Sequence, residues 1–273
     1  NGSTDKGFTV SAHSTIEVVA NTLPLNTTLN GVAAEQYQLA ALNAGILKKT
    51  GAGTLELKNL TVAANNANLS IEVVAGTLLL SQASTAAISA IDLPGAAGII
   101  VGTSGTVRLG DSSGNQISDT SSVLLNGSGS FDLAGFSETI DGLAGAGTVT
   151  TSGVSTFTIG GNNSAGLSPY TPAAAAAGVN ATGLNFFSGT LSNGTGTLSL
   201  TKTGSGTQII AAAQAYSGAT TISAGTLQLG IDNALPSGAG KAVITIAGNN
   251  KGTNVGAVTT NGSDKVFAPG TLD

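Results

Sequence analysis

The sequence predicts an all-β chain wound into a single-stranded parallel β-helix, or β-solenoid. Short segments such as Thr54–Leu57 and Thr226–Leu229 alternate strictly between apolar and polar residues, and this two-residue period is typical of strands. A glycine–hydroxyl–apolar tripeptide recurs at intervals that suit one coil of a solenoid. Hydrophobic residues make up 41% of the chain but aromatic residues only 4%, so the expected interior is a stack of aliphatic side chains.

The recurring tripeptide opens an alternating run at each of its copies. The spacing between copies is irregular, which solenoids tolerate because loops of different length can leave one face of the coil. With about 20–25 residues per coil and about 4.8 Å per rung, the chain would make about a dozen coils and a rod on the order of 55–60 Å. The copies begin at Gly53, Gly76, Gly105, Gly129, Gly147, Gly196, Gly225 and Gly270.

A longer repeat lies on top of the short one. The hexapeptide KTGAGT at Lys49–Thr54 returns as KTGSGT at Lys202–Thr207. In the same order, AGTLLL at Ala75–Leu80 returns as AGTLQL at Ala224–Leu229. Two coincident matches in one order indicate that the chain contains two copies of a larger unit.

These repeats suggest how the chain is divided. Helical signals are rare, and the one candidate helix is Ala33–Leu42, with Asn30 as its N-cap. The predicted units are an N-terminal segment (1–45), acting as a cap or as the start of the solenoid, and a β-helix (46–273) with long repeats at about 46–165 and 188–273 and an irregular insertion near 166–187.

Composition excludes several classes of function. The net charge is −5 and Arg108 is the only arginine, so no basic stripe exists to neutralise nucleic-acid phosphates. The chain has no cysteine, which excludes disulfides, thiolate catalysis and cysteine-ligated metals. No run reaches the roughly 18 apolar residues of a membrane-spanning helix.

Candidate site residues are few. His13 is the only histidine and lies among Ser and Thr; because a triad or metal site needs an imidazole beside other reactive groups, we expect an exposed polar residue. A glycosidase needs two carboxyl groups at a fixed separation, and the spacing of the available ones matches no such arrangement. We therefore expect solvated turn and strand charges, with no catalytic, cofactor-binding or metal-binding residue and no cofactor. The carboxylates considered are Asp111, Asp119, Asp132, Glu138 and Asp141, with Arg108 available to stabilise charge.

The second long repeat resembles a known family. Residues Lys202–Thr207, followed by Tyr216–Gly230, closely resemble the autotransporter-associated β-strand repeat. The resemblance covers roughly 46–273, with a gap around 166–187, and it implies a right-handed parallel β-helix in a large secreted bacterial surface protein, similar to autotransporter passengers. Further stretches that fit the family are Phe131–Ile140, Leu143–Val149 and Asp232–Pro236.

These observations together lead us to expect a structural role and no enzymatic activity. The chain would form a rigid rod for surface display, adhesion or fibre and sheet assembly, at the bacterial cell surface or outside the cell. Its expected partners are further copies of itself, met head-to-tail or laterally, or neighbouring repeats of the same large chain.

Two alternatives stay open. One is a β-helix enzyme that degrades polysaccharide, which Asp111→Asn or Asp132→Asn would inactivate. The other is a module that binds surface glycans on a stacking platform of Tyr37, Tyr170 and Tyr216.

Overall fold

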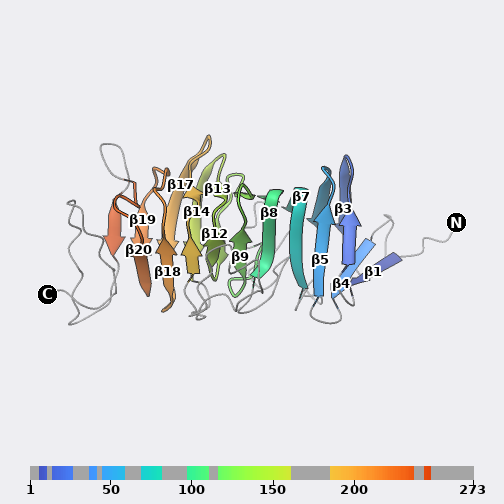
Figure 1. The fold of residues 1–273 in the computed structure, drawn as a ribbon, viewed down its shortest axis with the longest axis horizontal. Helices are drawn as coiled ribbons and strands as arrows, with labels where there is room; N and C mark the ends of the chain where they lie inside the picture. Colours follow the sequence, from blue (N-terminus) through green and yellow to red (C-terminus); the bar gives the residue numbers. More distant parts are fainter. Residues whose placement is uncertain are drawn as a thin grey trace.

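The computed structural model shows strands lying side by side along the long axis of the molecule (Figure 1). Every regular element among the described residues is a β-strand. The structure describes residues 6–10, 14–26, 37–41, 45–58, 69–81, 97–110, 116–160, 185–236 and 243–246.

A small two-stranded sheet lies near the N-terminus. Strands β1 (Lys6–Val10) and β4 (Tyr37–Ala41) pair in parallel, with Lys6 opposite Tyr37. The predicted helix over Ala33–Leu42 is therefore wrong for Tyr37–Ala41, and its remaining residues lie outside the described ones. Helix propensity is a weak preference, and here the backbone of this segment pairs with β1 instead.

The largest sheet has fourteen strands in two tracks. In the first track each strand pairs in parallel with the corresponding strand one coil later, which gives nine successive rungs among the described residues. Strands β7 and β8 are long enough to contribute to both tracks. The first track consists of β2 (Ser14–Glu17), β5 (Gly45–Thr50), β7 (Leu69–Ser81), β8 (Ala97–Leu109), β9 (Ser122–Leu125), β12 (Leu143–Gly145), β15 (Asn185–Phe187), β18 (Thr207–Ile210) and β20 (Thr226–Leu229).

The second track and a separate five-stranded sheet complete the coil. Strands β9, β10 and β11 follow one another along the chain and stack beneath β12, β13 and β14, respectively. The second track adds β3 (Thr22–Asn26), β6 (Thr54–Lys58), β10 (Ser130–Asp132), β13 (Thr148–Thr150) and β16 (Thr190–Leu191) to β7 and β8. The five-stranded sheet consists of β11 (Glu138–Ile140), β14 (Val154–Ile159), β17 (Thr197–Lys202), β19 (Thr220–Ile222) and β21 (Ile244–Ile246).

This connectivity, with parallel pairing from coil to coil, is that of a parallel β-helix, and it confirms the predicted fold class. Residues 14–26 already pair with β5 and β6. Of the expected insertion near 166–187, residues 185–187 form β15 in the long sheet.

The interior is filled by columns of apolar side chains that stack along the axis. Because successive residues of a strand point to opposite faces, parallel register places like residues above one another. Phe131 and Phe157, from different sheets, meet edge-to-face with ring centroids 5.8 Å apart. One column of fully buried residues runs through six coils as Leu55, Leu78, Val107, Phe131, Val149 and Leu191.

Candidate functional site: two buried lysine corners

The predicted carboxylates do not converge on one site. Asp132 lies on the surface of β10, where its Oδ2 is 3.5 Å from Nε of Arg108, and its Oδ1 accepts a hydrogen bond from the Ala134 N–H at 2.8 Å. This arrangement fits the expected strand-face charge. His13 and Asp111 lie outside the described residues.

Glu138 is buried, so the expectation that it is solvated was wrong. Its exposed fraction is 2%, and its carboxylate accepts hydrogen bonds from the backbone N–H groups of Gln116 at 2.7 Å and Thr139 at 3.1 Å. Burial raises the pKa of Glu138 to about 8, against the lowering effect of the backbone N–H donors. The side chain therefore fastens the segment at Gln116 to β11. Partial burial likewise raises the pKa of nearby Asp119.

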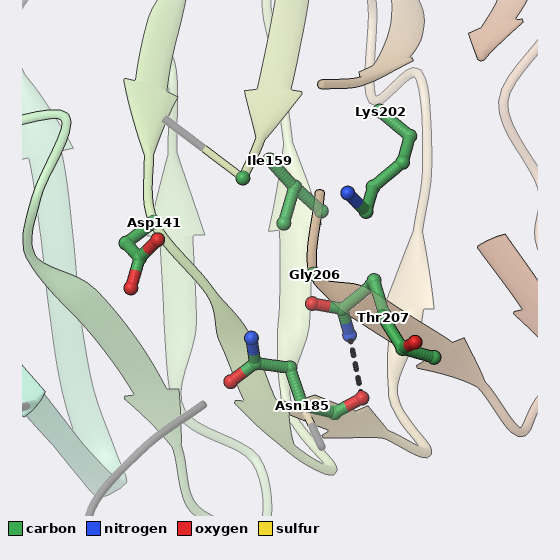
Figure 2. Close-up of a pocket in the computed structure, with 8 residues that line it drawn as sticks. Asp141, Ile159, Asn185, Lys202, Gly206 and Thr207 are labelled. Carbon is green, nitrogen blue, oxygen red and sulfur yellow. Dashed lines mark hydrogen bonds between the residues drawn. The ribbon is translucent and has the colours of Figure 1, made fainter. Parts of the chain in front are cut away.

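Asp141 is also buried, which again contradicts the expected solvation. It lines a small recess together with Asn185, Lys202 and Gln208 (Figure 2). Gln208 spans the recess wall, because its Nε2 donates to the carbonyls of Leu143 at 2.9 Å and Asn185 at 3.2 Å. The recess has a volume of about 10 Å³, which is room for about one water molecule and far too little for a sugar ring.

Two buried lysines are the functional groups that sequence reasoning missed. Lys49 is at 0% exposure near the end of β5 and Lys202 is at 2% at the end of β17. Nζ of Lys49 donates to the carbonyls of Thr50 at 2.9 Å, Gly51 at 2.7 Å and, from the next coil, Ala75 at 2.8 Å. Each lysine is the first residue of the repeated hexapeptide, so the repeat itself was the signal.

Lys202 repeats this arrangement in the second unit. Its Nζ donates to the carbonyls of Thr203 and, at 3.1 Å, Gly204. Burial lowers the pKa of Lys202 to about 8, and the nearby charge of Asp141 partly offsets the effect. Burial lowers the pKa of Lys49 as well. We call each lysine with its following turn a lysine corner.

A glycine of the next coil closes each corner. Gly225 has a φ of +69°, and a Cβ built on it would lie 2.1 Å from the carbonyl oxygen of Gly204 and 2.7 Å from Nζ of Lys202. Gly76 occupies the same place over Lys49, with a φ of +71° and the corresponding distance to Nζ also 2.7 Å. Only glycine fits so close a contact with a left-handed backbone. The hexapeptide that begins with the lysine and the AGTLxL hexapeptide that contains the glycine thus meet in one structural unit.

The lysine corners are arranged to hold the backbone together and not to carry out a reaction. A lysine with a lowered pKa can act as a nucleophile, but each Nζ here is engaged by backbone carbonyls inside the coil. Over the ranges that the structure describes, no group of three His, Asp or Glu side chains is arranged to hold a metal ion. Over the same ranges, no helix has the length and apolar character needed to cross a membrane.

Comparison with known protein families finds a match over the segment that contains the second lysine corner. Residues 200–229 match the family model of the passenger-associated-transport-repeat. The chain carries an autotransporter passenger-type repeat. The match confirms the resemblance over residues 200–229, and the repeat implies a passenger domain of a surface-associated protein. No curated protein and no solved structure matches the chain.

The matched repeat contains both partners of the second lysine corner. It starts within β17, includes Lys202 and its turn, and ends with β20 beyond Gly225. Lys202 and Gly225 therefore both lie inside the repeat, so the contact between successive coils is encoded within one repeat.

Tyr216 lies inside the same repeat, and its position contradicts the sugar-stacking platform. Its exposed fraction is 0%, and its hydroxyl lies 2.5 Å from Oγ1 of Thr220. Burial raises the pKa of Tyr216 to about 12. A ring enclosed in the core cannot stack on a sugar. Tyr37 belongs to β4, and Tyr170 lies outside the described residues.

Proposed function

We propose that this chain is a rigid β-helical scaffold within a passenger-type bacterial surface protein. It would hold neighbouring segments at a fixed spacing for surface display, adhesion or assembly into fibres and sheets, at the cell surface or outside the cell. The observation that carries the proposal is the uninterrupted ladder of parallel rungs around a filled aliphatic interior.

The mechanism of such a scaffold is the stacking of coils. Each coil contributes backbone hydrogen bonds to both neighbours and buries its apolar side chains against theirs, so stability accumulates along the axis. Burial of each large aliphatic side chain contributes about 1.5–3 kcal/mol. Fully buried residues such as Leu57, Leu80 and Leu109 stack on one another in register.

We further propose that the chain is not an enzyme and needs no cofactor. Support comes from the positions of the candidate carboxylates: Asp132 is paired with Arg108, and Glu138 holds backbone N–H groups. The third, Asp141, faces a recess that admits about one water. None of these arrangements resembles two carboxyl groups facing each other across a substrate cleft.

Negative-stain electron microscopy of the purified chain, at low and at moderate salt, tests the scaffold. We expect straight rods, either dispersed or joined into filaments or sheets; globular particles without a long axis would overturn the proposal. In parallel, the chain is incubated with a panel of polysaccharides. Hydrolysis that disappears in Asp132→Asn would show an enzyme instead.

A further inference from the structure

The outer face of the five-stranded sheet differs from the rest of the surface. In β14 and β17, residues alternate between buried and at least partly exposed along the strand. The outward residues of all five described strands are Thr, Ser or Val, without a single charge. Five threonines stand in register on successive rungs: Thr139, Thr158, Thr201, Thr221 and Thr245. We call this surface the threonine face.

Apolar side chains extend the threonine face at two places. Val154, opposite Thr197 in register, is 82% exposed, and Val243, directly before β21, is 72% exposed. Exposed valines lie beside a regular array of threonine methyl groups. Removing this flat, partly apolar surface from water is favourable in free energy.

The long sheet has a different outer surface. Glu56, Arg108 and Asp132 stand outward on its second track, and Lys48 lies 3.5 Å from Glu72 on its first track. Charges of this kind keep proteins apart and soluble. These charges therefore lie on the long sheet, while the threonine face offers no charge to prevent close approach.

A second copy of the chain is the partner that this face fits best. Its side chains repeat at the rung spacing of about 4.8 Å, and an identical coil has the same repeat, so ridges and grooves stay in step over all five rungs. Because the face itself carries no charge, the contact brings no like charges directly opposite one another, and the net charge of −5 repels only over a longer distance.

The size of the face sets the strength of the contact. Five rungs and strands of three to six residues give a face of about 300–400 Å². Two such faces would bury about 600–800 Å² in total, less than the roughly 1,200 Å² of a stable interface. A single pair of chains should therefore associate weakly, and many chains held side by side on a surface should associate firmly through multivalency.

We propose that the threonine face is a lateral self-association surface, by which two copies of this β-helix pack sheet against sheet. This inference rests on the proposed scaffold function and names the surface through which scaffolds would join side by side.

Analytical ultracentrifugation of the full chain over a wide concentration range tests this surface. The test variant carries Thr158→Lys and Thr201→Lys, which place two charges on adjacent rungs of the threonine face. The matched control carries Thr77→Lys and Thr106→Lys, which are also adjacent in register but lie on the long sheet. Circular dichroism and electron microscopy verify that every variant keeps the fold and the rod.

The average mass of the wild-type chain should rise toward that of a dimer with concentration, and more so at moderate salt because salt screens the net charge. The control variant should associate as the wild-type chain does, whereas the test variant should associate at least about tenfold more weakly than the wild type. A monomeric wild-type chain, or equal loss in both variants, would overturn the inference while intact rods still support the scaffold. A monomer retained on insoluble cellulose through the threonine face would also overturn it and assign the face to a neutral polysaccharide.

Discussion

Gly225 lies where one coil passes close to the preceding coil, and Gly225→Ala tests that contact. An alanine at a φ of +69° costs about 1–2 kcal/mol from the left-handed backbone alone. Its Cβ would also lie 2.1 Å from the Gly204 carbonyl oxygen and 2.5 Å from that of Gly206, so the rungs must separate. Separation would weaken the hydrogen bond from Thr226 N–H to the Gly206 carbonyl, now 3.0 Å, at about 0.5–1.5 kcal/mol.

Together these effects predict a loss of about 1.5–3.5 kcal/mol in the free energy of unfolding, which is a large share of the about 5–15 kcal/mol of an ordinary domain. Urea denaturation followed by circular dichroism measures it as a lower midpoint with an unchanged slope. Gly230→Ala, directly after β20, is the control because the nearest atom to its added Cβ is 3.2 Å away. Equal midpoints for the two variants would refute the close packing at the lysine corner.

Three further substitutions test other parts of the coil by urea denaturation. Phe131→Ala removes a ring at 0% exposure that meets Phe157 edge-to-face, and it should cost about 3–5 kcal/mol; a cost below 1 kcal/mol would contradict the filled interior. The raised pKa of Glu138 (from 4.5 to about 8) contributes stability that is full below pH 4.5 and lost as pH rises through about 8. Glu138→Gln should remove that part of the pH dependence, and an unchanged profile would disprove the role of burial. Ala134 has a φ of +53°, so Ala134→Gly should raise stability by about 0.5–1 kcal/mol; a destabilised variant would argue against the left-handed turn.

Much of the fold follows from the two-residue period and the glycine repeats. Residues such as Leu55 and Leu78, each following a Gly-Thr pair, stack in the interior as the repeat predicts. Tyr37–Ala41 did not follow the helical preference of their residues, because pairing with β1 depends on a segment about thirty residues earlier.

The lysine corners show why the buried charges were not predicted. A lysine is ordinarily solvated. The carbonyls that hold Lys49 and Lys202 come from a strand end, from the following turns and, for Lys49, from the next coil, and a strand pattern does not reveal this placement. The burial of Glu138 was not predicted for a similar reason, since the Gln116 N–H that donates to it belongs to an earlier part of the chain. The repeated hexapeptide marked the lysine corners but did not indicate which of its residues point inward.

Cysteine cross-linking tests the coil-by-coil pairing most directly, because the chain has no cysteine of its own. Thr77 and Thr106 are partners on adjacent rungs, and Thr106 is in turn the partner of Ser130. Adjacent rungs are about 4.8 Å apart, within the Cα range of a disulfide, whereas two rungs span about 9.6 Å. After oxidation of the dilute protein, Thr77→Cys/Thr106→Cys should form an intramolecular disulfide and Thr77→Cys/Ser130→Cys should not. Equal cross-linking of both pairs, or of the second pair alone, would contradict the parallel β-helix.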